Sequence, residues 1–116
     1  MSYQYLIDSV GGNIEDARGV LSLLFETARS EMLQLRAGIR AGDPQLVEQA
    51  AHQLSGATGT CGLSDIHEKL RLLESQATVE PLDSLRDSVE EIGNLLQQAE
   101  ATCDEDLARH AGEATP

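Results

Sequence analysis

Apolar residues near the end of the chain recur at alternating spacings of three and four residues, and this pattern constrains the fold more than any other feature. The set is Leu82, Leu85, Val89, Ile92, Leu96, Ala99 and Cys103. Such spacing puts every member on one side of an α-helix, and it continues over three heptads as in bundle helices. The segment therefore predicts a long helix whose apolar stripe must be covered by other helices.

Three earlier segments show the same helical period, so the same chain supplies the partners of this stripe. Their apolar positions are Ala17, Leu21, Leu24, Phe25, Ala28, Met32, Leu35 and Ile39 in the first, Val47, Ala50, Leu54, Ala57 and Cys61 in the second, and Ile66, Leu70, Leu73 and Ala77 in the third. Residues 3–9 form a shorter helical candidate before them. Four long helices and one short helix are therefore expected.

Residues with strong preferences for helix ends mark the boundaries. Asn13 and Ser64 are expected N-caps, and Asp43-Pro44 reads as an N-cap followed by proline at the first helical position. Gly42 suits the left-handed conformation that closes a helix, and Pro81 opens the last helix.

The loops between the long helices are short, which predicts that neighbouring helices run antiparallel. We expect an all-α fold, namely an antiparallel up-down four-helix bundle over residues 1–103 with a short N-terminal helix that covers one end. Residues 104–116 are polar apart from Leu107 and are expected to form a frayed or disordered C-terminal tail.

Composition indicates one small domain and excludes several partners. The 116 residues include 3% aromatics and no tryptophan, so the core must be aliphatic. A formal net charge of −12 repels nucleic acid and anionic membranes. Without a signal peptide or a membrane-spanning apolar run, a cytoplasmic location is expected, for a free protein or for a domain of a larger membrane-anchored one. The two cysteines form no disulfide framework, and no metal-ligand spacing is present.

One histidine lies within the second long helical segment, on the side away from its apolar stripe. His52 is two residues from the nearest stripe members on either side, and at about 100° per residue this places it opposite them. Gly56 and Gly59 continue its row, with Ser55 beside it, although glycine inside a helix costs about 1 kcal/mol relative to alanine. These small residues predict that a large partner approaches the imidazole closely. The alternative is an ordinary solvated histidine.

The stretch around this histidine resembles the signature of histidine phosphotransfer (HPt) domains. The matching residues are Ala51-His52-Gln53-Leu54-Ser55-Gly56, then Gly62 and Ile66, then Leu73-Glu74. The resemblance covers about residues 3–100. The Gly-Ala-Thr and Cys-Gly steps within residues 56–62, together with Gly11-Gly12, look most like HPt domains of BarA/GacS-type hybrid sensor kinases. Ser55 stands where the family usually has lysine, so that position cannot directly neutralise a phosphoryl group.

The resemblance implies a phosphorelay intermediate. His52 would accept a phosphoryl group from a receiver-domain aspartate of a hybrid sensor kinase and pass it to a response regulator. The receiver would supply the aspartate, Mg²⁺ and a lysine, so this chain would need no cofactor and would have no autonomous kinase activity. A monomer is expected. The alternative is a degenerate HPt domain that serves as a docking or scaffold bundle without chemistry, and the missing lysine gives it some weight.

Several neighbours are expected to support the histidine. Glu74, at a position that often carries Gln or Glu facing the histidine in related domains, is a candidate to orient the ring or is an ordinary exposed carboxylate. His67 and Arg71 share the row of Glu74 on their helix. One expectation is that they contact the partner or the phosphate, and the alternative is that they are ordinary solvated side chains. The full set of expected supporting residues is Gln49, Gln53, Ser55, Gly56, Gly59 and Glu74.

A receiver domain presents an apolar patch around its active-site cleft, so its partner should offer exposed apolar residues near the histidine. Val20 and Leu23 lie off the main stripe of their helix and are expected to form this docking surface. Leu6 or Ile7 would join it if the short helix covers the end of the bundle near His52. Singly exposed apolar residues are also common on small domains and then need no partner.

Overall fold

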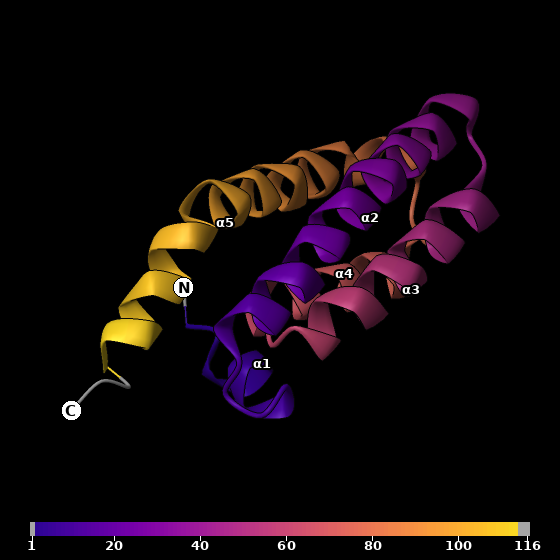
Figure 1. The fold of residues 1–116 in the computed structure, drawn as a ribbon. Helices are drawn as coiled ribbons and strands as arrows, with labels where there is room; N and C mark the ends of the chain where they lie inside the picture. Colours follow the sequence, from indigo (N-terminus) through magenta and orange to yellow (C-terminus); the bar gives the residue numbers. More distant parts are fainter. Residues whose placement is uncertain (1, 114–116) are drawn as a thin grey trace.

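The computed structural model describes residues 2–113, and all of the regular secondary structure in that range is helical, with no strand. Figure 1 shows its elements, which are α1 (Gln4–Ser9), α2 (Ile14–Ala41), α3 (Pro44–Thr60), α4 (Ser64–Gln76), the 3₁₀ helix η1 (Leu82–Leu85) and α5 (Arg86–Glu113). The predicted all-α class is confirmed. The last helix starts as η1 directly after Pro81, where the sequence predicts it to open.

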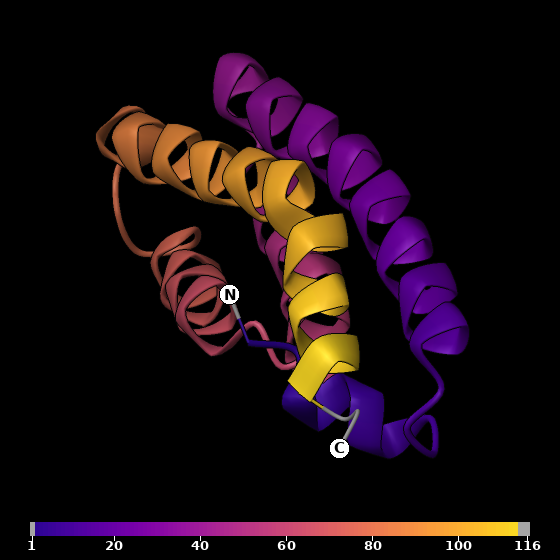
Figure 2. The same ribbon diagram turned by 60° about the vertical axis from the view of Figure 1, so that its left-hand side comes forward.

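The four long helices surround one aliphatic core. Helix α2 contacts α3 and α5, and α4 contacts the same two helices from the other side, which closes the ring (Figures 1 and 2). Every residue of the predicted apolar stripes is buried except Ala57 and Leu82, which are half-buried. The periodicity therefore identifies the core correctly, because only residues on the inward side of each helix escape water.

Most of the predicted helix ends have the expected local chemistry. The Asn13 side chain accepts from the Asp16 amide at 3.0 Å, and that of Asp43 accepts from the Leu46 amide at 3.2 Å. Gly42 has φ +67°, a left-handed conformation that suits glycine. The prediction for Ser64 is wrong, because the N-cap of α4 is Leu63, whose side chain is buried and cannot cap, and Ser64 is the first residue of the helix.

The C-terminal segment is not a tail through residue 113, because α5 continues to Glu113. Leu107 is fully buried, and the Tyr3 amide donates to Nε2 of His110 at 3.2 Å. Figures 1 and 2 show the segment that precedes α1 running beside the last turns of α5, which are drawn in yellow. The start of the chain thus contacts the end of α5, where Leu107 is buried. These contacts hold as a helix a segment whose sequence is otherwise polar. The rest of the predicted tail, residues 114–116, lies outside the described residues.

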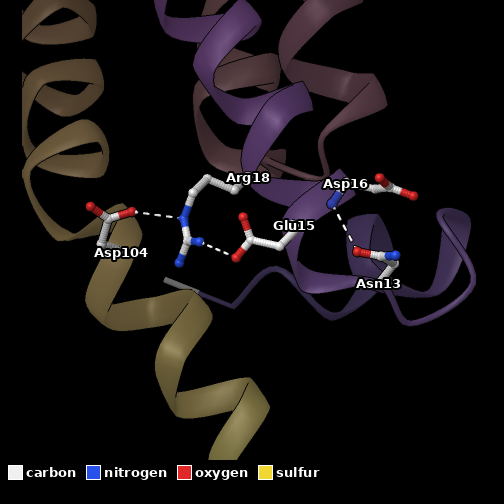
Figure 3. Close-up of polar contacts among 5 residues, drawn as sticks. All are labelled: Asn13, Glu15, Asp16, Arg18 and Asp104. Carbon is white, nitrogen blue, oxygen red and sulfur yellow. Dashed lines mark hydrogen bonds and ion pairs between the residues drawn. The ribbon is translucent and has the colours of Figure 1, made fainter.

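Three ion pairs join the exposed edges of α2 and α5. Arg18, Arg29 and Arg36 on α2 contact Asp104, Glu100 and Glu90 on α5 at 3.3, 2.7 and 3.0 Å. Figure 3 shows the first pair, in which the Arg18 guanidinium also contacts Glu15 on its own helix. The Arg18 pair connects the start of α2 to the later part of α5, and the Arg36 pair connects the later part of α2 to the start of α5. Exposed pairs contribute only about 0–1 kcal/mol each, so they favour this register while the core provides the stability.

Candidate functional site

His52 lies on the outer surface of α3 with its side chain 72% exposed. Its helix neighbours Ala50 and Leu54 are buried in the core, which leaves the histidine on the opposite side as the periodicity predicts. An imidazole at this place is available to another macromolecule without any movement of the bundle.

The carboxylate of Glu74 on α4 holds one nitrogen of this ring. Nδ1 of His52 lies 3.0 Å from Oε2 of Glu74, whose side chain is partly shielded. A carboxylate oxygen only accepts hydrogen bonds, so Nδ1 donates and the neutral ring carries its lone pair on Nε2. In the neutral ring, the α3–α4 contact therefore sets the tautomer with the proton on Nδ1 and the lone pair on Nε2.

The two glycines near His52 have different surroundings. A Cβ built on Gly56 would meet nothing within 4 Å, so the helix surface beside His52 is open there. A Cβ on Gly59 would lie 3.0 Å from Nδ1 and 3.1 Å from Cε1 of His67. The expectation that both glycines leave room for a partner is therefore wrong for Gly59, because the His67 ring of α4 already fills that room.

The same histidine explains the environment of Ser55. Ser55 is 5% exposed and faces α4, where Nδ1 of His67 donates to its carbonyl oxygen at 2.7 Å and lies 3.2 Å from its Oγ. The Ser55, Gly59 and His67 contact is thus part of the packing between α3 and α4. Helical spacing places Ser55 and Gly59 on one side of α3, but it gives no sign that a ring from α4 covers them.

The other predicted site residues lie on several surfaces. Gln49 and Gln53 are exposed on α3, and Arg71 is exposed on α4, where it lines a shallow groove with Glu74. On α2, Leu23 is 64% exposed while Val20 is half-buried and packs against the core.

The suggestion that Leu6 or Ile7 joins the docking surface is wrong, because both side chains of α1 point into the core. Tyr5 is the large exposed residue of α1, and its ring lies against Gly62 at the turn between α3 and α4. A helix of six residues is too short for its apolar spacing to show which side faces the bundle. The sequence alone therefore could not tell that Leu6 and Ile7 are buried while Tyr5 is exposed.

Both cysteines are buried free thiols. Burial raises the pKa of the Cys61 thiol to about 11 and also raises that of Cys103. Among the described residues no three His, Cys, Asp or Glu side chains gather in a way that would hold a metal ion. None of the helices within residues 2–113 combines the length and the apolar character needed to cross a membrane.

The fold and this surface define a helical module that presents one oriented imidazole to a partner. The family model described as Hpt domain matches residues 19–111, and the chain belongs to this family. Hpt domains are phosphocarriers rather than catalysts, and the family has a phosphotransfer role in two-component signalling through receiver domains. No curated protein and no solved structure matches the chain.

Proposed function

We propose that this chain is a phosphorelay intermediate in which Nε2 of His52 accepts a phosphoryl group from a receiver-domain aspartate and passes it to a response regulator. The observation that carries the proposal is the contact of His52 with Glu74, which occupies Nδ1 at 3.0 Å while the ring stays 72% exposed. The open surface at Gly56 supports it, because a receiver must approach until its phosphoaspartate reaches the ring.

The chemistry then needs little from this chain beyond position. The lone pair on Nε2 attacks the phosphorus in line, the bond from phosphorus to the aspartyl oxygen breaks, and the aspartate leaves as a carboxylate. The ring becomes an imidazolium that keeps its Nδ1 proton, so no general base is required. Glu74 stabilises this positive charge, and the reverse sequence delivers the phosphoryl group to the next receiver aspartate. Mg²⁺ and a lysine belong to the receiver in this scheme.

The partner surface of the proposal extends from His52 to α2. Leu23, together with the half-buried Val20, offers apolar contact at the edge of α2. The proposal also includes a cytoplasmic monomer. It further includes an affiliation with the HPt domains of BarA/GacS-type hybrid sensor kinases, which rests on the run of residues 56–62 together with Gly11-Gly12. The antiparallel up-down order of the bundle belongs to it too, and the ion-pair register between α2 and α5 supports that order.

The test is transfer of labelled phosphate from a purified receiver domain that has been phosphorylated with acetyl phosphate. The expected product carries an acid-labile, base-stable label in the wild type and in His67→Gln, and none in His52→Gln. Circular dichroism of each variant checks that the fold is intact. Label that persists in His52→Gln contradicts the proposal, and receiver binding without any label in the wild type favours the docking scaffold instead.

A further inference from the structure

The phosphorylated site lacks a positive charge from its own helix. Phosphorylation adds close to two negative charges at neutral pH, and α3 contains no lysine or arginine. Ser55, one turn after His52, is neutral and is covered by His67. Nδ1 of His67 donates a hydrogen bond to the Ser55 carbonyl, and the His67 ring lies against Gly59. Gly59 is farther from His52 along α3 than Ser55 is. Of the two helices that form the His52–Glu74 contact, only α4 can therefore supply a cation from this chain.

The arginine and lysine side chains of the described residues fall into two groups, those that form an ion pair with a carboxylate and those that do not. Six of them contact a carboxylate within 4.0 Å, namely Arg18, Arg29, Arg36, Lys69, Arg86 and Arg109. Within residues 2–113, Arg40 and Arg71 are left without such an ion pair. Arg40 lies at the end of α2, where it lines a groove with Glu90 and Arg86. Of these two cations, only Arg71 belongs to the helix that holds the His52 ring.

Arg71 lies one helical turn before Glu74, on the exposed side of α4 that adjoins α3. It lines a shallow groove with Glu48 of α3 and with Glu74, yet no carboxylate fixes its guanidinium. Residues three apart on a helix are neighbours, so Arg71 stands beside the carboxylate that binds Nδ1 of His52. The other cation of α4, Lys69, is engaged with Glu91 of α5 at 2.9 Å.

We propose that Arg71 is the phosphoryl-binding cation of this site, an inference that rests on the proposed phosphorylation of His52. Its guanidinium donates hydrogen bonds to the phosphoryl oxygens once the group is attached to Nε2. A planar guanidinium suits this task, because it donates two parallel hydrogen bonds to phosphate oxygens. In the unphosphorylated chain the same cation stays unpaired and moderates the repulsion between Glu48 and Glu74. The missing lysine of α3 is thus replaced from the neighbouring helix.

The test uses potassium phosphoramidate as the donor, which makes it independent of any receiver. Its P–N bond breaks as the bond from Nε2 to phosphorus forms, and ammonia leaves. The lifetime of the phosphohistidine is then measured for the wild type, Arg71→Gln, Arg71→Lys and the matched control Arg40→Gln. Exposed pairs are worth about 0–1 kcal/mol, so Arg71→Gln should shorten the half-life about two- to fivefold. Arg71→Lys should recover part of it, and Arg40→Gln should equal the wild type.

A second readout separates contact from general electrostatics. In ¹⁵N-labelled protein the Nε–H resonance of Arg71 should shift on phosphorylation, and that of Arg40 should not. An unchanged half-life in Arg71→Gln overturns the inference, as does an equal shortening in Arg40→Gln. If the wild type takes up no phosphate on His52, the proposed function fails and the role of Arg71 fails with it, whereas normal uptake with an unaffected Arg71 variant removes only the latter.

Discussion

Alanine at Gly56 and alanine at Gly59 should affect the free energy of unfolding differently, although both glycines lie inside α3. Replacing a helical glycine by alanine stabilises a helix by about 1 kcal/mol. At Gly56 the added Cβ meets nothing within 4 Å, so Gly56→Ala should realise that full gain. For a domain of this size the gain corresponds to a rise in Tm of about 4 °C.

At Gly59 the same methyl group comes within 3.0 Å of Nδ1 of His67, so the ring must move by a few tenths of an ångström. That movement strains the 2.7 Å hydrogen bond from Nδ1 to the Ser55 carbonyl, which is worth about 0.5–1.5 kcal/mol. The loss offsets the helical gain, and Gly59→Ala should leave stability within about 0.5 kcal/mol of the wild type.

Urea unfolding followed by circular dichroism measures both variants under identical conditions. The matched control repeats Gly59→Ala in a His67→Ala background, where the ring is gone and the gain of about 1 kcal/mol should return. Equal stabilisation by the two alanines in the wild-type background would refute the packing role assigned to His67.

Three further results are expected. Glu74→Gln can still accept a hydrogen bond from Nδ1 but loses the negative charge that stabilises the imidazolium, so it should label on His52 more slowly than the wild type. Glu74→Ala loses the orienting bond as well and should label more slowly again, about two- to tenfold below the wild type in a phosphoramidate time course; equal rates in the wild type and Glu74→Ala would remove Glu74 from the site. Leu107→Ala should lower the free energy of unfolding by about 2–5 kcal/mol, while a loss below about 0.5 kcal/mol would restore the tail interpretation of this segment. Burial raises the pKa of Cys61 from 9.0 to about 11, so folding favours the neutral thiol. The contribution of this thiol to the free energy of unfolding is therefore fully present below pH 9 and is lost as the pH rises to about 11. Iodoacetamide at pH 8 should accordingly modify Cys61 only after unfolding, and rapid modification of the native protein would contradict its burial.

The sequence predicts the helices and the core well because both follow from a repeated local pattern. The stripes from Ala17 to Cys103 are buried almost without exception, and the Asn13 and Asp43 caps form as expected. The exposure of His52 follows from the same arithmetic. These features depend on residues within one or two turns of each other, where spacing determines position.

The misses involve packing between different helices or segments of the chain. The ring of His67 covers Gly59, and the Tyr3 amide before α1 donates to His110 near the end of α5, yet neither contact leaves a local pattern in the sequence. At the start of α4, Ser64 has the residue type of an N-cap, but the buried Leu63 takes that place because its side chain belongs to the core. Tertiary packing overrides local preference at each of these points.

The most direct test of the account is to identify the nitrogen that carries the phosphoryl group. Protein labelled with ¹⁵N at histidine is treated with phosphoramidate, and the coupling between phosphorus and the ring nitrogens is read by NMR, with His52→Gln as the control. The Glu74 contact leaves only Nε2 of His52 available, so the account predicts phosphorus bonded to that atom and absent from the variant. Phosphorus on Nδ1 of His52, or on His67 in place of His52, would contradict it.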